Sequence, residues 1–515
     1  MLGVIGTMSW LAQRVAVPAP VLFAAAGVLW SLTPWLPRAD IGPEIVLAVF
    51  LPPLLYADAW EASWIDFRRW LRPILQLAIG LVAFTILTVG LVAHWAMPSL
   101  PWAACFLLGA IVSPTDTVAV HAVLERLHVP RRATAILGGE SLVNDATGLL
   151  GVGLATVVIT TGVFEAGRIG AIFTQIAGLG LVIGIVVGLA AARINCYVRG
   201  THILFVFSLL APYAAYFLAE AAGASGVLAV VIAGFVASWR LHYIAPESRA
   251  DLYASWEQLA FLLNAMMFLY VGLETPVRLK EAFAAAPGIL GIALLISATV
   301  VLTRFVWILP GAYVPLWLLP RLRRREGSYP SLRGVTLVSW CGIRGAVSLA
   351  AALSLPVLLL QGRAFPGRAE IIACTLVVIL VTLIGQGVTL LPLVRRLGLS
   401  DVESSDEEVH RAREVMLEAG ITRLDAFCSE ESCPIAVYRL RDAMSDQLAS
   451  LKAEDAMAQA HAKRRLEVAD EVRHAVYEAQ TDALLALRDR GEVNDRVHQI
   501  LQLDLDRSNA GVRAV

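Results

Sequence analysis

Apolar runs of about 20 residues, the length that crosses a bilayer as a helix, follow one another from Val17 to Leu397. A shorter apolar run over residues 1–13 precedes them. The predicted spans are residues 17–37, 43–57, 72–97, 101–125, 133–160, 169–192, 202–220, 223–240, 256–274, 285–313, 334–360 and 370–394. The pattern predicts an all-α polytopic membrane protein with about 13 transmembrane helices.

Beyond Ser400 the pattern changes to amphipathic helical spacing with mixed charges. Residues 400–515 hold 15 Lys and Arg against 24 Asp and Glu, a net charge of −9, whereas the preceding part has a net charge of +8. We therefore predict a transmembrane domain over residues 1–398 and an acidic helical tail over residues 399–515. Two interpretations of the tail remain open, a regulatory or dimer-supporting region and a solvated appendage.

Charges between the predicted spans give the orientation. One set of alternate loops holds 18 arginines, and the opposite set holds only six Lys and Arg. Because cytoplasmic loops carry the excess of positive charge, the acidic tail is predicted to lie in the cytoplasm. Two further arginines, Arg304 and Arg344, lie inside predicted spans.

Composition favours a membrane protein over a soluble domain. The chain is 58% hydrophobic and 16% charged, against about 25% charged in soluble domains. Its six cysteines form no CxxC pair, and no HExxH, P-loop, GxGxxG or GxSxG pattern stands in a usable context. The N-terminus lacks a basic region before its apolar run, so a cleaved signal peptide is not expected.

The sequence GESLVND, residues 139–145, lies inside the predicted span 133–160. Helical spacing places Glu140, Ser141, Asn144 and Asp145 on one face. A charged side chain near the bilayer centre costs about 2.5–3.5 kcal/mol on insertion scales, and lipid offers it no partner. These two carboxylates therefore need a cation, a proton or an arginine.

Two other spans contain features that interrupt a helix. In SPTD, Pro114 removes a backbone donor in mid-span, and Thr115 and Asp116 follow it. Irregular backbone at this depth survives only where it lines a polar cavity or is buried in protein. In CGIRG, Gly342 and Gly345 flank Arg344, which suits either a carboxylate or the carbonyl end of a half-helix. Two interrupted spans in corresponding halves indicate a transporter site.

Three other polar positions are more ambiguous. Asp58 follows Pro52 and Pro53 near a span end, where it is either interfacial or part of a substrate entrance. Asn264 is predicted to make an interhelical hydrogen bond rather than to bind a ligand. The sequence does not identify the acid that pairs with Arg304.

Five motifs occur in order within residues 15–398: LPPLL at 51–55, SPTD at 113–116, GESLVND at 139–145, SGVLAVVIAG at 225–234 and GIRGA at 342–346. With them the chain resembles bacterial Na⁺/H⁺ antiporters of the monovalent cation:proton antiporter-1 family. The resemblance implies an inverted-repeat fold with crossed discontinuous helices, a homodimer in the bacterial inner membrane, and exchange of cytoplasmic Na⁺ (alternatively Li⁺ or K⁺) for an external proton. No cofactor is implied beyond the transported ions.

The resemblance also assigns roles to residues. Asp145 would bind Na⁺ and the proton in competition, beside Asn144, with Ser141 and the Thr115 carbonyl as further Na⁺ ligands. Asp116 would balance the crossed half-helices, and Glu140 with Arg344 would form a buried ion pair. The Asn-Asp pair at 144–145 resembles the electroneutral branch of the family.

The chain departs from the family pattern at two points, and two other classes of protein are alternatives to an antiporter. Relatives place an acid where this chain has Ala57, so Asp58 stands one position late for the ion entrance, and the first span is shorter than the family's. A cation channel would share the polar site without proton coupling. An intramembrane aspartyl protease would use Asp116 and Asp145 as a dyad, although the chain lacks its Gly-x-Gly-Asp pattern.

Overall fold

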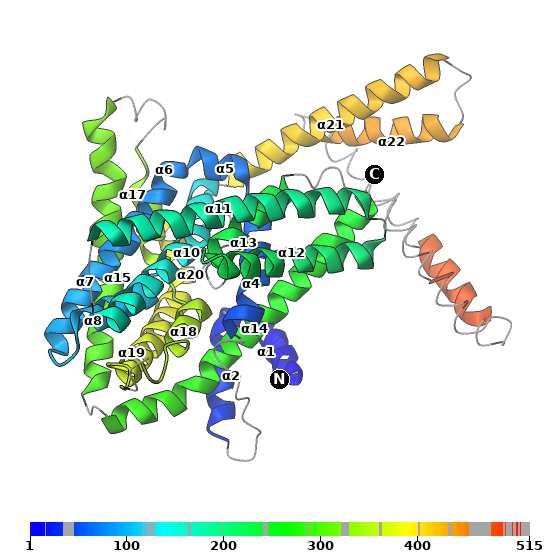
Figure 1. Ribbon diagram of the computed structural model, residues 1–515. Helices are drawn as coiled ribbons and strands as arrows, with labels where there is room; N and C mark the ends of the chain where they lie inside the picture. Colours follow the sequence, from blue (N-terminus) through cyan, green and yellow to red (C-terminus); the bar gives the residue numbers. More distant parts are fainter. Residues whose placement is uncertain are drawn as a thin grey trace. The chain divides into compact units, whose positions relative to one another are not determined.

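The computed structural model describes residues 1–15, 17–33, 46–116, 118, 120, 124, 129–162, 166–198, 200–239, 246–285, 288–320, 329–359, 363–399, 402–430, 435–452, 475–487, 490, 497, 501–502 and 505. The chain divides into two compact units, Met1–Asp401 and Val402–Val515. The described residues are almost entirely helical (Figure 1). An isolated β-bridge between Leu358 and Ala364 is the only extended pairing among them.

The first unit consists of helices that are joined mostly by short connections. They are α1 (Leu2–Arg14), α2 (Ala19–Ser31), η1 (Val46–Phe50), α4 (Leu51–Glu61), α5 (Trp64–Arg69), α6 (Leu71–Leu75), η2 (Gln76–Leu81), α7 (Val82–Ala96), α8 (Trp102–Val112), α10 (Arg131–Thr161), α11 (Ala166–Tyr197), α12 (Thr201–Ala221), α13 (Gly226–Ser238), α14 (Pro246–Ala285), α15 (Ile289–Leu318), α17 (Leu332–Trp340), α18 (Ala346–Leu353), α19 (Arg368–Leu380), η4 (Val381–Gln386) and α20 (Gly387–Leu397). The elements η1, η2 and η4 are π-helical turns.

Seven described helical runs are long and apolar enough to cross a membrane. They are Leu71–Ala96, Arg131–Thr161, Phe173–Tyr197, Thr201–Ala221, Ser248–Ala284, Ile289–Leu318 and Arg368–Leu397. Shorter apolar helices are α2, α8 and α13. The prediction of an all-α polytopic membrane protein is confirmed, whereas the count of 13 spans stays a prediction. The end of the span 17–37 and the start of the span 43–57 lie partly outside the described residues.

Both predicted interruptions are present. Helix α8 ends at Val112, and residues 113–116 carry no regular secondary structure. Helix α17 ends at Trp340, and residues 341–345 are irregular before α18 begins. The order of long helix, interrupted segment and long helix therefore occurs twice, over residues 71–161 and 289–397. Several residues of the predicted span between 117 and 125 lie outside the described set.

Small residues let some of these helices approach closely. In α11, Gly180, Gly184 and Gly188 recur every four residues and face α13. A Cβ on Gly184 would stand 2.5 Å from the Ala229 carbonyl oxygen, so only glycine fits there. Close backbone contact of this kind replaces the hydrophobic effect, which does not drive helices together in lipid.

The second unit contains α21 (Val402–Glu430), α22 (Ile435–Lys452) and a further helix over residues 475–487. Helices α21 and α22 pack against each other. Exposed ion pairs cross between them: Arg441 Nε lies 2.6 Å from Asp425 Oδ1, and Lys452 Nζ lies 3.1 Å from Glu414 Oε1. Exposed pairs contribute little to stability, so they chiefly fix the register of the two helices.

Candidate functional site

The GESLVND residues lie in the middle of α10, which runs without interruption after Pro130. Glu140 is 1% exposed, Asp145 is 6% exposed, and Ser141 and Asn144 are also buried. The predicted polar face is therefore inside the protein and not against lipid. A face with two carboxylates at this depth is stable only with partners, and the neighbouring interrupted segment provides some of them.

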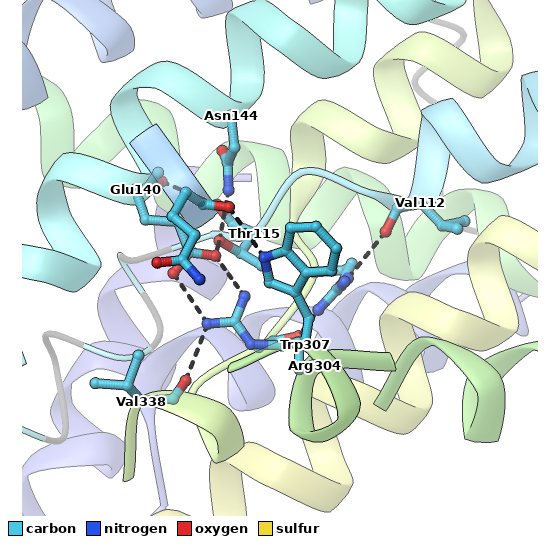
Figure 2. A network of polar contacts seen from close by, with 11 residues as sticks. Val112, Thr115, Glu140, Asn144, Arg304, Trp307 and Val338 are labelled. Carbon is cyan, nitrogen blue, oxygen red and sulfur yellow. Dashed lines mark hydrogen bonds and ion pairs between the residues drawn. The ribbon is translucent and has the colours of Figure 1, made fainter. Parts of the chain in front are cut away.

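Three hydrogen bonds join α10 to the irregular residues after α8 (Figure 2). Ser141 Oγ donates to the Thr115 carbonyl oxygen at 2.8 Å, and Asn144 Nδ2 donates to Thr115 Oγ1 at 2.7 Å. Thr115 Oγ1 in turn donates to Glu140 Oε1 at 3.4 Å. Pro114 has no N–H to donate, so the Ala110 carbonyl accepts from Ser113 Oγ at 2.9 Å instead, and Ser141 gives the Thr115 carbonyl a side-chain donor.

Asp116 connects the two interrupted segments. Its backbone N–H donates to the Ile343 carbonyl at 2.8 Å, which ties residues 113–116 directly to residues 341–345. Its Oδ1 accepts from the Val118 N–H at 2.8 Å, and its carboxyl group lies against Gly345, the N-cap of α18. A carboxylate at this point offsets the partial positive charge at the beginning of a half-helix. This geometry supports the role predicted for Asp116.

Arg344 places a positive charge at the carbonyl ends of the interrupted helices, opposite in sign to Asp116 at the beginning of α18. Its Nε donates to the carbonyl of Val112, the last residue of α8, at 2.9 Å, and its guanidinium also donates to the Gly342 carbonyl. Its backbone N–H donates to Thr382 Oγ1 at 3.1 Å. A cation at the carbonyl end of a helix offsets the partial negative charge there. Of the two partners that the sequence allowed for Arg344, the structure therefore shows the carbonyl end.

The predicted ion pair between Glu140 and Arg344 is wrong, because Glu140 pairs with Arg304 from α15. The Arg304 guanidinium donates to Glu140 Oε1 and, from Nη2 at 3.0 Å, to Oε2. Nη2 also donates to the Val338 carbonyl at 2.9 Å (Figure 2). Both side chains are essentially inaccessible, at 0% and 1% exposed. This fork of two parallel bonds is the geometry that arginine and carboxylate favour, and it leaves the Arg344 donors to the half-helix carbonyls.

The two interrupted segments approach closely at Gly345. A Cβ there would overlap with the Oδ2 and Cγ atoms of Asp116. Since Asp116 is bonded through both its backbone and its side chain, we expect Gly345→Ala to lower the free energy of unfolding by about 1–3 kcal/mol or more. The measurement is the thermal midpoint of the purified protein. Gly153→Ala on α10 is the control, since nothing lies within 4 Å of its Cβ, and an equal midpoint in both variants would contradict this packing.

Asp145 lines a small cavity. A cavity of about 40 Å³ is lined by Asp145, Thr115 and Asp116 together with Asp58, Ser141, Asn264 and Ser348. A water molecule needs about 10–15 Å³ of such volume, so the space has room for a monovalent cation together with one or two waters. Among the described residues, no group of three or more His, Cys, Asp and Glu is placed to hold a metal ion. The lining offers mixed carboxylate, carbonyl, hydroxyl and amide oxygens, which suit a hard cation.

Two of the residues that line this cavity, Ser348 and Asn264, were not predicted from the sequence to lie at the ion site. Ser348 on α18 is 1% exposed, and its Oγ finds no hydrogen-bond partner within the described residues. Asn264 on α14 lines the cavity, although the sequence predicted only an interhelical hydrogen bond for it. Asn144 Oδ1 is likewise buried without a donor from the described part of the chain. Buried oxygens without donors are uncommon, and Ser348 Oγ, which unlike Asn144 belongs to a residue that lines the cavity, is a place where a cation can bind.

A larger cavity of about 490 Å³ adjoins the small one, and both are lined by Asp58, Val118 and Asn264. Its other acidic residues are Glu61, Asp66 and Glu257, and its arginine is Arg131. Asp66 Oδ2 accepts from Arg131 Nε at 3.0 Å. Asp58 stands between the wide acidic cavity and Asp145, which agrees with the predicted entrance even though Asp58 is one position late in the motif.

Two interrupted segments that cross at mid-span, beside a buried carboxylate and a small oxygen-lined cavity, define a helical ion transporter. Comparisons with known proteins agree. Residues 2–396 match the transmembrane sodium/hydrogen exchanger family. An Escherichia coli protein named an uncharacterized Na(+)/H(+) exchanger, YjcE, is 32% identical over 437 residues, 79% of this chain and 77% of its own. A Mycobacterium tuberculosis protein with the same kind of name, the uncharacterized Na(+)/H(+) exchanger Rv2287, is 32% identical over 520 residues, 98% of this chain and 93% of its own.

The chain belongs to the sodium/hydrogen exchanger family. It is therefore a cation:proton antiporter, a secondary transporter and not an enzyme, which sets the protease and channel alternatives aside. The solved structure of the sodium proton antiporter MjNhaP1 from Methanocaldococcus jannaschii superposes with a TM-score of 0.61 at 19% identity. The match covers 77% of this chain and 96% of that one, and it confirms the predicted antiporter fold.

Proposed function

We propose that this protein exchanges cytoplasmic Na⁺ for an external proton at one shared site, the Asp145 carboxylate. The observation that carries the proposal is the cavity of about 40 Å³ that is lined by Asp145, by the interrupted backbone at Thr115 and by the Ser348 hydroxyl, which has no partner among the described residues. Either ligand neutralises a carboxylate that is costly when it is charged and empty inside the membrane. One negative group that holds either one Na⁺ or one proton makes the exchange one for one and electroneutral.

The coordination that we propose uses oxygens from three elements. Asp145 supplies the charge, Ser141 and the Thr115 carbonyl supply oxygens on one side, and Ser348 supplies a hydroxyl on the other. Asn144 fixes Thr115 through the bond from its Nδ2. Because these ligands come from α10, α18 and an interrupted segment, a bound ion both neutralises Asp145 and holds them together so that they can move as one unit. Alternating access then requires that only the loaded site moves readily across the membrane.

The excess of arginine in one set of alternate loops, together with the larger cavity, supports the proposed orientation. Arg131 lines the wide acidic cavity, and it belongs to the loops that hold the excess of arginine. We infer that this cavity opens to the cytoplasm, so that the chain is in an inward-facing state. The same reasoning puts the tail in the cytoplasm and the transporter in a bacterial inner membrane. We propose a homodimer as the working assembly, which is what the family resemblance implies.

Ion selectivity is the part of the proposal that relatives leave most open. A Bacillus subtilis relative named a sodium, potassium, lithium and rubidium/H(+) antiporter is 32% identical over 387 residues, 71% of this chain and 57% of its own. An oxygen site of this kind accepts cations of similar size. We expect Na⁺ and Li⁺ to dissipate a preformed proton gradient in everted membrane vesicles. Dissipation by K⁺ alone would replace Na⁺ by K⁺ as the substrate.

Asp58 is proposed to attract cations from the wide cavity toward Asp145. We expect Asp58→Asn to raise the apparent KM for Na⁺ several-fold with little change in the maximal rate, because a carboxylate in a cleft raises the local cation concentration. Initial rates of Na⁺-driven proton movement measure both quantities. Glu257→Gln removes a charge from the same cavity farther from Asp145, and it should shift the KM less. A larger shift in Glu257→Gln than in Asp58→Asn would contradict this path.

A further inference from the structure

Helix α18 is short, and its position decides where the Ser348 hydroxyl lies. The helix has 8 residues, all of which except Val347 are buried, and an isolated helix of this length is marginal by itself. Ser348 lines the cavity of Asp145, yet its Oγ makes no hydrogen bond within the described residues that would fix it there. The place of this hydroxyl therefore depends on the contacts that hold the two ends of α18.

The beginning of α18 is held by Asp116. The carboxyl group of Asp116 lies against Gly345, the N-cap of the helix, and its backbone N–H donates to the Ile343 carbonyl two residues earlier. A carboxylate at this end offsets the partial positive charge of the helix. The opposite end needs donors and a positive charge instead.

The carbonyl end of α18 obtains some of its donors locally. A helix leaves its last four carbonyls without partners inside it, which here are those of Ala350, Ala351, Ala352 and Leu353. The N–H and the Oγ of Ser354 donate to the first two, at 3.0 Å and 2.9 Å. The Leu355 N–H donates to the third at 3.4 Å. The fourth carbonyl receives its donor from another helix.

That donor is Arg368, the first residue of α19. Its Nη2 donates to the Leu353 carbonyl at 3.4 Å, and its Nε donates to the Leu355 carbonyl at 2.9 Å. A cation at the first position of a helix is unfavourable for that helix, because the N-terminal end is partially positive. At the carbonyl end of α18 the same charge is favourable. Arg368 therefore serves the neighbouring half-helix and not its own.

The connection between the two helices returns Arg368 to the end of α18. Leu358 and Ala364 form a β-bridge, which closes the connection on itself. Gly367, the N-cap of α19, has a φ of 68°, a left-handed conformation that glycine adopts without strain. The chain therefore enters α19 in a direction that keeps its first side chain beside the carbonyls of α18.

We propose that Arg368 is a positioning residue for cation binding: by holding the carbonyl end of α18, it keeps the Ser348 hydroxyl at the cavity of Asp145. Ser348 binds Na⁺ in the proposed function, on which this role of Arg368 rests. Arg368 is not among the residues that line the cavity of Asp145 or the wide acidic cavity, so it acts through α18 and not by contact with the ion.

The test measures Na⁺-driven proton movement by the purified full chain in proteoliposomes. We expect Arg368→Gln to raise the apparent KM for Na⁺ about three- to tenfold with a maximal rate within about twofold of wild type, because weaker binding of the ion raises the KM alone. Arg368→Lys should stay closer to wild type, because lysine keeps a cation and a donor at this end of α18. Arg363→Gln is the matched control, since Arg363 is an exposed arginine of the same connection.

A double-mutant cycle with Ser348→Ala shows whether Arg368 acts through Ser348. Independent effects on the KM multiply, whereas we expect Arg368→Gln to raise the KM less than about 1.5-fold when residue 348 is already alanine. Hydrogen exchange gives a readout apart from transport. Protection of the amides of residues 346–355 should fall in Arg368→Gln, while that of residues 372–380 in α19 should stay at the wild-type level.

Three results would overturn the role of Arg368 alone. They are an unchanged KM in Arg368→Gln, a double variant whose KM change equals the product of the two single changes, and a loss of protection that spreads evenly over α18 and α19. The last of these would make Arg368 a general structural residue. A wild-type chain without Na⁺-driven proton movement would instead overturn the proposed function, and the role of Arg368 with it.

Discussion

Asp145→Asn is expected to abolish cation:proton exchange while the protein still folds and reaches the membrane. Asparagine keeps the shape of the side chain and its capacity for hydrogen bonds, but it can neither neutralise a cation nor carry the exchanged proton. The loss should exceed about 100-fold, because the substitution removes the group that both substrates require. Initial rates of Na⁺-driven proton movement in everted vesicles measure the loss, and the yield of monodisperse protein measures folding.

Asp251→Asn is the matched control for that experiment. Asp251 is an exposed carboxylate on α14 that accepts from Thr201 Oγ1 at 3.2 Å, far from either interrupted segment in the sequence. It should retain nearly the full rate. Na⁺-dependent proton movement that persists in Asp145→Asn would move the shared site to another carboxylate, with Asp116 and Asp58 the next ones along the cavity.

Arg304→Met is expected to be the most destabilising single substitution in the core. It leaves the Glu140 carboxylate buried without its fork of two hydrogen bonds, and removing one partner of a buried pair costs about 3–5 kcal/mol. Methionine fills much of the volume, so the cost arises from the unpaired charge. Unfolding in mixed micelles and the folded yield provide the measurement. The double variant Glu140→Gln/Arg304→Met should recover a large part of the loss.

A double-mutant cycle separates this pair from the one predicted from the sequence. Residues in a shared ion-pair network show interaction energies of about 0.5–3 kcal/mol. We expect the upper part of that range for Glu140 with Arg304 and the lower part for Glu140 with Arg344, whose side chain donates to Val112 and Gly342. A stronger coupling of Glu140 to Arg344 would contradict the pairing of Glu140 with Arg304.

The helical class and both interruptions could be predicted because each depends on local chemistry. Pro114 lacks an N–H, and Gly342 and Gly345 weaken a helix, whatever surrounds them. The polar face of α10 follows from the helical spacing of its residues. The burial of that face follows because lipid cannot solvate Glu140 or Asp145. The family resemblance added the pairing of the two interruptions, which the bond from the Asp116 N–H to Ile343 bears out.

The partner of Glu140 could not be predicted, because the sequence does not say which of two buried arginines faces α10. Arg304 lies in an uninterrupted apolar helix, whereas Arg344 lies in the GIRGA motif. The resemblance carried by that motif led to the incorrect pairing of Glu140 with Arg344. Ser348 was overlooked for a similar reason. A serine on an apolar helix usually bonds to its own backbone, and only the structure shows that this hydroxyl lines the cavity without a partner among the described residues.

Competition between Na⁺ and protons in the wild-type protein tests the shared site most directly. The measurement is the apparent KM for Na⁺ of exchange in proteoliposomes, determined at a series of pH values with the maximal rate recorded at each. One carboxylate that holds either ligand predicts that the KM rises as pH falls, approaching about tenfold per pH unit on the acidic side, because binding of the two ligands is reciprocally linked. The maximal rate at saturating Na⁺ should be recovered at low pH. An Na⁺ KM that is independent of pH would contradict a site shared by the two ions.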